Sequence, residues 1–418
     1  MRKILFISMS IPYNQVRHAG GKTFNYYINK LTEDPENEIT MIAKVLPEEE
    51  KYTCTINPLI KSIFVRTPQN KLKKLWAYFK SLNSKLNPNY KYGNVLTKEI
   101  FSQITMQMKL LANNGYIPDV IILEWTWMLL FIDEVKKIFP KSKYVASEHD
   151  VSFLGAERQI DLVTGLKKKR AIKYYNALKR NELASINKCD IVFTHNYKDK
   201  QLLLENGISE QKIDTIVPYY LKKNIKREPQ KGSILFYGAM NRIENSSAAI
   251  WFIKNVMPLL EDMAIHFVIL GNNPPEELKK YESDKVTVTG FVDDVTPYFE
   301  EAMCLVAPLL MGAGIKVKII EAMAMGVPVL TNDIGIEGIN AKDRKEYLCC
   351  ETAREYEKCI RNMINNYIEL EIVGVGGKKL IESEYDLDKS FEHYADRIND
   401  LIKKNRVVDN EMKEVWYA

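Results

Sequence analysis

Residues 303–339 have the sequence MCLVAPLLMGAGIKVKIIEAMAMGVPVLTNDIGIEGI, in which a glycine-rich segment and a short apolar helix pattern separate two apolar runs. The runs at 303–308 and 327–331 predict buried β-strands. The segment between them predicts a loop followed by a helix over 316–325, which Gly326 ends. Strand, loop, helix and strand in this order are typical of an α/β protein with a parallel sheet.

The loop and the start of this helix predict an anion site. Gly312 and Gly314 leave the loop without bulky side chains at these points, so its backbone N–H groups can approach a ligand. The N-terminus of the helix carries a partial positive charge, and Lys316 and Lys318 add full charges beside it. We therefore expect a phosphate or diphosphate to bind here.

Glu321 is the only acidic residue in this otherwise apolar helix. A carboxylate next to a bound diphosphate can accept hydrogen bonds from a ribose diol, and we assign this function to Glu321. The alternative is a salt bridge between Lys318 and Glu321 on a surface helix, worth roughly 0.2–0.5 kcal/mol. Apolar neighbours such as Ile319 and Ile320 are unusual on a surface helix and favour ligand binding.

The sequence EAMAMGVPV at 321–329 resembles the donor-binding motif of retaining GT-B glycosyltransferases of the family-4 type, the glycosyl transferases group 1. In that family a Glu-x7-Glu pattern leads into EAMA-x-G-x-PV, and Glu321 matches the second glutamate. The first glutamate falls on Ala313, and the glycines and lysines of the anion site resemble the G-x-G-x-(R/K)-x-K run of other members. The resemblance implies a nucleotide-sugar donor, linked to UDP or GDP, and donor binding that needs no metal ion.

The chain of 418 residues is long enough for two domains, and apolar strand candidates alternate with helical stretches along it. This pattern predicts two α/β, Rossmann-like doubly wound domains, and the resemblance implies the GT-B fold, in which they face each other across a cleft. We expect an acceptor-side domain over 1–217, a linker over 218–232 and a donor-binding domain over 233–400. The last helix, over 401–418, is expected to cross back to the N-terminal domain. Strands are predicted at 3–8, 38–43, 120–123, 143–147 and 191–195, and at 233–237, 265–270, 286–289, 304–307 and 327–330.

The loop after the first strand of the second domain supplies further donor-site candidates. Gly238 ends this strand, and family members carry a basic residue in the loop, which makes Arg242 a predicted second phosphate ligand. The alternative for Arg242 is an exposed loop arginine. Asn245 or Ser246 is expected to cap the helix that follows.

Two glycines early in the chain, Gly20 and Gly21, are predicted to open a helix after the first strand. Similar enzymes use a glycine pair at this place, so that backbone amides face the diphosphate of the donor.

His149 lies directly after the strand predicted at 143–147, where ligands bind in open α/β sheets. Related enzymes often have a histidine here that faces the donor sugar, and we assign this contact to His149; a structural histidine is the alternative. The family's mechanism is front-face displacement without a covalent intermediate. Glu124 and Glu148 are candidates for assisting the acceptor.

Charge is divided unevenly along the chain. Residues 1–232 contain 38 Lys and Arg against 23 Asp and Glu, whereas residues 233–418 contain 21 against 31. Much of the positive excess lies in the stretches 71–92, which is also rich in aromatic residues, and 167–180. Such stretches suit a solvated helix face, an anionic membrane or lipid-linked acceptor, or nucleic acid. Because no nucleic-acid-binding motif accompanies them, nucleic acid is the least favoured.

Other features favour a cytoplasmic enzyme that uses no metal. No apolar run approaches the roughly 18 residues of a membrane span, and the start MRKILFISMSIPY lacks a signal-cleavage site. The six cysteines show no metal-binding spacing and indicate no disulfide framework. One D-x-D motif occurs at 386–388, where Asp388 is interpreted as a helix N-cap.

We therefore predict a retaining hexosyltransferase that acts on a glycan or lipid-linked acceptor in cell-surface polysaccharide or glycoconjugate assembly. Loss of the first glutamate at Ala313 motivates one alternative, a non-catalytic GT-B partner subunit of a glycosyltransferase complex. A second alternative is a P-loop NTPase, because VRHAGGKT at 16–23 lacks only the first glycine of that motif. A sugar-nucleotide epimerase shares the fold but not the donor motif.

Overall fold

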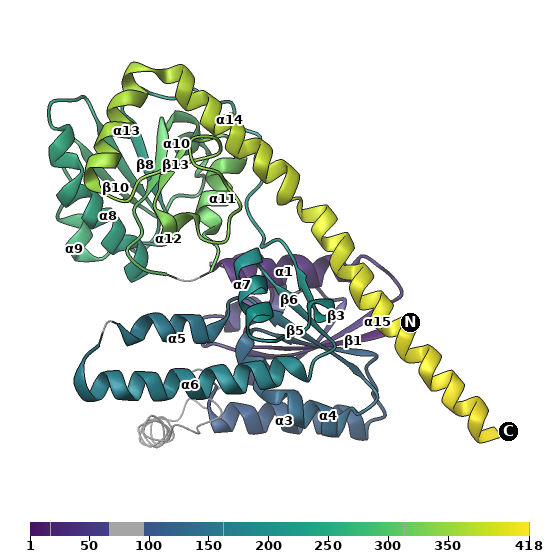
Figure 1. Ribbon diagram of the computed structural model, residues 1–418. Coiled ribbons are helices and arrows are strands. Elements are labelled where there is room, and N and C mark those ends of the chain that lie inside the picture. The colour runs from purple at the N-terminus through teal and green to yellow at the C-terminus, as the bar shows by residue number, and fades with distance from the viewer. Residues whose placement is uncertain (17, 67–95, 162, 313, 418) are drawn as a thin grey trace. The chain divides into compact units, whose positions relative to one another are not determined.

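The computed structural model describes the chain except residues 17, 67–95, 162, 313 and 418, and it describes no side chains at 367–370 and 406–417. The chain divides into two compact units, which are described one at a time (Figure 1). Unit 1 comprises Met1–Tyr219 together with Leu387–Ala418, and unit 2 comprises Tyr220–Asp386.

Unit 1 is built on a seven-stranded parallel sheet of order β3-β2-β1-β4-β5-β6-β7. The order reverses at β1, which pairs with β2 on one side and with β4 on the other, and such a switch point is where open α/β sheets bind ligands. The strands are β1 (Arg2–Ser8), β2 (Asn37–Val45), β3 (Ile60–Arg66), β4 (Val120–Glu124), β5 (Lys143–Glu148), β6 (Ile191–Thr194) and β7 (Ile213–Thr215). The sequence predicted all of these except β3 and β7.

Helices cover both faces of this sheet, since the side chains of each strand alternate between two cores. Leu5 and Ile7 of β1 enter one core, and Ile4 and Phe6 enter the other. The helices are α1 (Ala19–Thr32), α3 (Lys98–Asn113), α4 (Ile132–Ile138), α5 (Ser152–Ile160), α6 (Gly165–Asn187), α7 (Tyr197–Glu205) and α15 (Leu387–Tyr417), with 3-10 turns η1 (Glu50–Thr55), η2 (Thr126–Phe131) and η3 (Glu210–Lys212).

The last helix belongs to unit 1 over its whole length. Tyr394, Ile398 and Ile402 of α15 are buried in the second of the two cores, and Tyr27 of α1 packs edge-on against Tyr394 with ring centroids 5.0 Å apart. The predicted final helix, 401–418, therefore began too late. Residues 387–400, assigned by sequence to the second domain, lie in unit 1 because their apolar face packs there.

Unit 2 contains a six-stranded parallel sheet of order β10-β9-β8-β11-β12-β13. Its strands are β8 (Ser233–Tyr237), β9 (His266–Leu270), β10 (Val286–Gly290), β11 (Cys304–Ala307), β12 (Val329–Thr331) and β13 (Leu348–Cys349). The short edge strand β13 was not predicted. The helices are α8 (Ile243–Asn255), α9 (Glu276–Lys279), α10 (Thr296–Glu301), α11 (Val317–Ala324), α12 (Asp333–Ile336), α13 (Ala353–Asn365) and α14 (Tyr367–Glu384), with the 3-10 turn η4 (Met257–Leu260).

The segment predicted as a linker, 218–232, contains neither helix nor strand. Its Arg227 is nevertheless fixed to unit 2, because the guanidinium donates hydrogen bonds to the backbone carbonyls of Gly326 and Ala302, the latter at 2.7 Å. The chain thus becomes part of unit 2 well before β8 begins.

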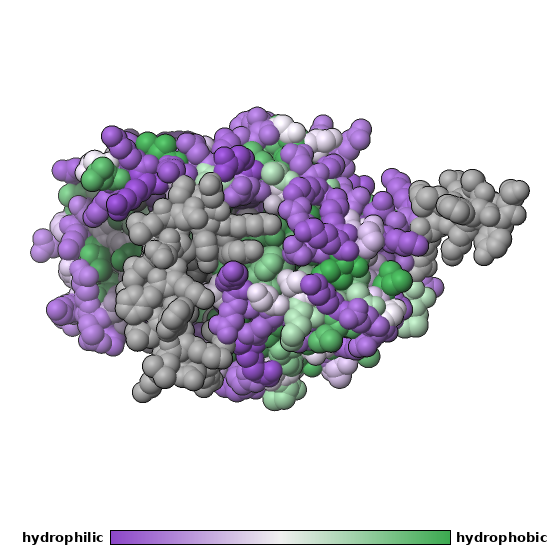
Figure 2. Space-filling view, turned by 90° about the horizontal axis from the view of Figure 1, so that it is seen from below, coloured by the Kyte–Doolittle hydropathy of each residue, from purple (hydrophilic) through white to green (hydrophobic). Residues whose placement is uncertain are grey.

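The face seen in Figure 2 mixes hydrophilic and hydrophobic side chains. The basic stretch 71–92, on which one membrane-contact prediction rests, lies outside the described residues. None of the helices in the described part of the chain combines the length and the apolar character needed to cross a bilayer.

Candidate functional site

The helix α11 follows β11 and a glycine-rich loop, as the sequence predicted, and it is a buried helix. All residues from Ile319 to Ala324 are buried, so the alternative of a salt bridge on a surface helix is wrong. Apolar burial fixes the helix against the sheet and directs its N-terminus, with its partial positive charge, to the C-terminal edge of the strands.

Lys318 lies in the first turn of α11 and is half-buried. Its ammonium donates a hydrogen bond to Oδ1 of Asn245 and lies 4.9 Å from the centre of the Phe236 ring. Burial, with the nearby charge of Arg242 as a smaller cause, lowers the pKa of Lys318 to about 7. A buried lysine with a depressed pKa is stabilised in its charged form when an anion arrives.

Glu321 is also buried, with 4% of its surface exposed, but it has other partners. Its Oε1 accepts a hydrogen bond from the backbone N–H of Leu221 at 3.1 Å. Burial and then the proximity of Glu321 raise the pKa of Tyr237, at the end of β8. The carboxylate is thus held at the C-terminal edge of the sheet, between β8 and α11.

Gly238 leaves room for the side chains of Asn245 and Lys318. It has a φ of +154°, and a Cβ at this position would lie 2.9 Å from Nδ2 of Asn245 and 3.2 Å from Nζ of Lys318. Gly312 and Gly314 also have positive φ values, of 134° and 68°, which other residues rarely adopt. The loop next to α11 therefore depends on glycine for its backbone path.

The other predicted phosphate ligands differ in exposure. Lys316 is the N-cap residue of α11, and its ammonium bonds to the carbonyl of Gly314 and lies 3.7 Å from Glu337. The Arg242 side chain is 60% exposed and pairs with Glu244. Arg242 thus lies in the loop as predicted. Its exposure is also what the alternative, a surface loop arginine, requires. Ala313, the position of the missing glutamate, is outside the described residues.

Asn245 is the residue of this unit that sequence reasoning missed. It was predicted, with Ser246, to cap α8, but both lie inside the helix, which begins at Ile243. The side chain of Asn245 instead donates to the carbonyl of Ala239 at 2.9 Å and accepts from Lys318. The sequence signal for this function was the position of Asn245 just inside a helix that follows a strand ending in glycine.

In unit 1, Gly20 and Gly21 lie in the first turn of α1, after the end of β1. Nδ1 of His18 caps the helix by accepting the Gly21 N–H at 2.9 Å. The P-loop alternative does not fit here, because the Thr23 hydroxyl donates to the carbonyl of Ala19 at 3.0 Å and accepts from the Tyr219 N–H at 2.9 Å.

His149 lies directly after β5 and is stacked between two rings. The centre of its ring is 4.6 Å from that of Trp125 and 4.2 Å from that of His195. Its Nε2 is 2.6 Å from Oε1 of Glu124, and a Cβ on Gly20 would lie 3.0 Å from its Nδ1. Burial, and then the charge of His18, lowers the pKa of His149 to about 3, so the ring is neutral at physiological pH.

Glu124 and Glu148 do not lie where an acceptor could touch them. Glu124 is 4% exposed and Glu148 is fully buried. Oε2 of Glu148 accepts from the Thr126 hydroxyl at 2.5 Å, and burial followed by the charge of Glu182 raises the pKa of Glu148 well above its usual value. The structure thus does not support direct contact of either carboxylate with an acceptor.

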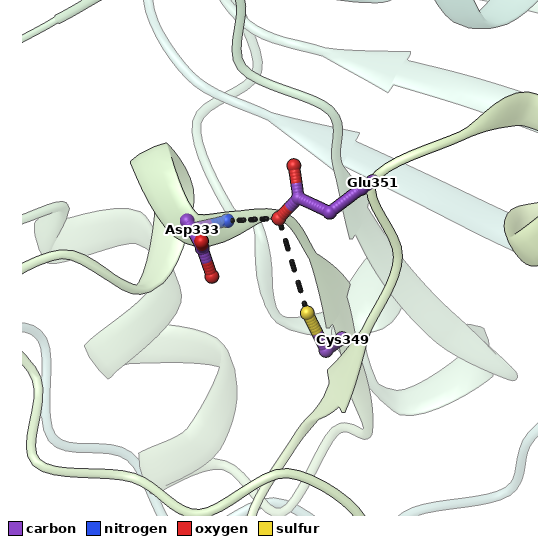
Figure 3. Close-up of side chains that lie close together, drawn as sticks. All are labelled: Asp333, Cys349 and Glu351. Atoms are coloured by element: carbon purple, nitrogen blue, oxygen red, sulfur yellow. Dashed lines mark hydrogen bonds between the residues drawn. The ribbon is translucent and has the colours of Figure 1, made fainter.

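One group of potential metal ligands occurs among the described residues: Asp333, Cys349 and Glu351, whose donor atoms lie within 4.8 Å of one another (Figure 3). Oε1 of Glu351 already accepts the backbone N–H of Asp333 at 2.6 Å. This bond joins the start of α12 to the segment after β13.

Asp388 of the D-x-D motif is not an N-cap as predicted, because α15 begins one residue before it. The Tyr26 hydroxyl donates to the Asp388 carboxylate at 3.3 Å.

Comparison with known proteins identifies the segment that holds α11. Residues 231–366 match the model of the family described as glycosyl transferases group 1, which confirms the resemblance of EAMAMGVPV to that group. A curated relative, an uncharacterized protein in the cps region of Klebsiella pneumoniae, is 26% identical over 170 residues, which is 38% of this chain and 44% of the relative. The chain therefore matches less than half the length of that relative.

Solved structures resemble the chain over nearly its whole length. Sucrose-phosphate synthase from Thermosynechococcus elongatus has a TM-score of 0.67 and 14% identity, with 97% of this chain and 100% of that chain covered. A mutant of S. aureus TarM, in complex with Fondaparinux, alpha-GlcNAc-glycerol and UDP, has a TM-score of 0.66 and 13% identity, with 96% and 100% covered. These likenesses concern the fold, and they confirm the predicted GT-B class of α/β architecture.

Proposed function

We propose that this protein, whose residues 231–366 match the glycosyl transferases group 1 model, is a glycosyltransferase that moves a hexose-type sugar from a nucleotide donor to a glycan or lipid-linked acceptor with retention of configuration. One observation carries the proposal. Glu321 is buried and the half-buried Lys318 lies three residues before it in α11, next to a loop that requires glycine, so a cation and a carboxylate are held beside a helix N-terminus.

Unit 2 supplies the groups that would hold the nucleoside diphosphate. Lys318, Lys316 and the N–H groups of α11 bind the diphosphate, and Arg242 joins them by leaving Glu244. Glu321 accepts hydrogen bonds from the ribose hydroxyls. Gly238, Gly312 and Gly314 allow the backbone to approach the phosphates. The donor is linked to UDP or GDP, and the UDP in the TarM complex supports the choice of a uridine nucleotide.

Unit 1 supplies the contact to the transferred sugar. We assign His149 to this contact because its ring is neutral and is held between Trp125 and His195 at the end of β5. Of the glycine pair at the start of α1, the amide of Gly20 contributes to diphosphate binding, since the N–H of Gly21 donates to Nδ1 of His18. In the transfer, the acceptor oxygen forms a bond to the anomeric carbon as the bond from that carbon to the diphosphate oxygen breaks. The acceptor proton passes to the leaving phosphate, and both events occur on one face of the sugar.

The acceptor is proposed to be a growing cell-surface polysaccharide or glycoconjugate. The relative from the cps region and the glycan-related molecules in the TarM complex support this class of acceptor. A cytoplasmic site, with peripheral contact to a membrane that holds a lipid-linked acceptor, is consistent with the basic surface of α6. Its first half exposes Leu166 (74%) and Tyr174 (44%) among Lys167, Lys169, Arg170 and Lys173.

Release of UDP or GDP from a panel of nucleotide sugars, with and without glycan acceptors, tests the proposal. We expect release from one donor class, continued turnover in a chelator, and a product whose anomeric configuration by NMR matches that of the donor. Binding of nucleotide without turnover of any donor would instead favour the non-catalytic partner subunit. Absence of both binding and turnover would contradict the proposed function.

A further inference from the structure

We propose that Glu124 is a positioning residue that selects the tautomer of His149, so that Nε2 carries the imidazole proton and Nδ1 is left as a hydrogen-bond acceptor. This inference rests on the proposed contact between His149 and the transferred sugar. It replaces the acceptor-side role predicted for Glu124.

The geometry provides the first argument. Oε1 of Glu124 lies 2.6 Å from Nε2 of His149 and 3.1 Å from the Ser147 hydroxyl. Both side chains are buried, with 5% and 9% of the Glu124 and His149 side chains exposed. An ionised carboxylate can only accept hydrogen bonds, so Ser147 and the Nε2–H group of His149 both donate to it.

The two rings that stack on His149 do not by themselves determine which of its nitrogens carries the proton. Trp125 and His195 lie against the two faces of the ring at interplanar angles of 14° and 22°. Such packing fixes the plane of the ring but does not distinguish its two nitrogens. Gly20 lies at the Nδ1 edge, where a Cβ would come within 3.0 Å of Nδ1 and 3.3 Å of Nε1 of Trp125. The ring therefore has one fixed orientation, and Glu124 decides which nitrogen is protonated.

The charges around the pair agree with this function. The titratable groups that face it are His18 before α1, His195 after β6 and Tyr394 of α15. Burial, and then His149, lowers the pKa of His195 well below its usual value, so both histidines are neutral at physiological pH. Burial raises the pKa of Glu124 to about 7, and the hydrogen bond from Ser147 opposes this rise. Ionised Glu124 accepts the proton of Nε2, whereas protonated Glu124 would donate to Nε2 and leave the imidazole proton on Nδ1.

The consequence for the transferred sugar is a change in hydrogen-bond polarity. With Glu124 ionised, Nδ1 accepts from a sugar hydroxyl. With Glu124 protonated, Nδ1 becomes a donor and the same hydroxyl must turn. The transfer step should therefore depend on the ionisation of a residue that does not touch the substrate.

The test replaces Glu124→Gln, an isosteric change that removes the ionisation. Glu49→Gln is the matched control, because Glu49 is a buried glutamate of the same unit that accepts from Ser10 and from the Leu46 N–H, away from His149. We expect Glu124→Gln to lower kcat by about tenfold to a hundredfold with little change in the donor KM, and to remove the rise of kcat between about pH 6 and pH 8. Glu49→Gln should leave kcat and its pH dependence unchanged. Glu124→Gln should have no further effect in a His149→Ala background, since it acts through that ring.

Nitrogen-15 NMR of the His149 ring provides a readout that does not need activity. Wild-type protein should show Nε2 protonated and Nδ1 unprotonated at pH 8, and Glu124→Gln should show a mixture of tautomers. An unchanged tautomer in Glu124→Gln, or an equal loss of kcat with and without His149, would overturn the inference. A protein that shows the predicted tautomer but transfers no sugar would instead contradict the proposed function and leave the role of Glu124 on His149 standing.

Discussion

At the scale of single residues, the sequence identified the chemical groups but not all of their partners. Lys318 and Glu321 were found because charged residues stand out in an apolar helix; Glu321 is buried and Lys318 is half-buried. Asn245, which accepts a hydrogen bond from Lys318, was assigned to a helix cap because the exact first residue of α8 could not be read from the sequence. Tertiary contacts of this kind have no local signature. The same holds for the hydrogen bond between Glu124 and His149, which are 25 residues apart.

The lowered pKa of Lys318 leads to a prediction about protons. Burial holds this pKa at about 7, and a bound diphosphate must raise it, because an opposite charge favours the ammonium. Binding of UDP or GDP at pH 7.5 should therefore take up a proton, and affinity should rise as pH falls from about 8.5 to 7. Calorimetry in buffers of different ionisation enthalpy measures this uptake. Lys279→Met, at an exposed helix position, should keep it, and Lys318→Met should lose it; the same uptake in both variants would contradict the assignment.

Glu182 leads to a prediction about stability. Burial raises its pKa to about 8, above the usual value near 4.3, so the folded protein binds a proton that the unfolded chain has released. The contribution of Glu182 to the free energy of unfolding is full below about pH 4 and is lost as pH rises toward 8, by up to about 1.4 kcal/mol per pH unit. Urea melts between pH 5.5 and 7 should show a shallower decline for Glu182→Gln than for wild type. Glu205→Gln, at an exposed position, should match wild type, and an equal slope in all three proteins would show that Glu182 is ionised when folded.

At the scale of elements, periodicity and composition predicted the central strands and missed the edges. Strands such as β1, β4 and β11 are continuous apolar runs because both of their faces are buried, which is a strong signal. The unpredicted strands β3, β7 and β13 lie at the ends of the two sheets and are only partly buried. A helix start was predicted at Asp388, but the end of the second domain was placed at residue 400, although Phe391, Tyr394 and Ile398 recur at helical spacing before it.

The attachment of α15 to unit 1 can be measured. Tyr394 is 2% exposed and packs against Tyr27 and Phe193, with ring centroids 5.0 and 4.7 Å away. We expect Tyr394→Ala to lower the free energy of unfolding of unit 1 by about 3–5 kcal/mol, as for other large aromatic side chains removed from a core. Glu392→Ala, two positions earlier on the exposed side of the same helix, should change it by less than about 0.5 kcal/mol. Denaturant melts compare the two, and a loss below about 1 kcal/mol for Tyr394→Ala would show that α15 is not part of the core.

At the scale of the whole molecule, the uneven charge leads to a prediction about membranes. The exposed first half of α6 combines basic and apolar side chains, which should bind anionic vesicles with about 1 kcal/mol per basic residue near the surface, screened by salt. Co-sedimentation should show binding that increases with anionic lipid and decreases with salt. Lys169→Glu with Arg170→Glu should remove it, while Lys285→Glu, in unit 2, should not. Equal, negligible binding to neutral and anionic vesicles at low salt would assign α6 to a solvated surface.

If the start of α11 binds the nucleoside diphosphate of a sugar donor, calorimetric titration of UDP and GDP should detect this binding. Wild-type protein should bind one of them, and Lys318→Ala and Glu321→Ala should each weaken binding by at least about tenfold while the protein stays folded, since each removes a group that touches the ligand. Lys279→Met should bind as wild type does. Wild-type affinity in either the Lys318→Ala or the Glu321→Ala variant would contradict the account.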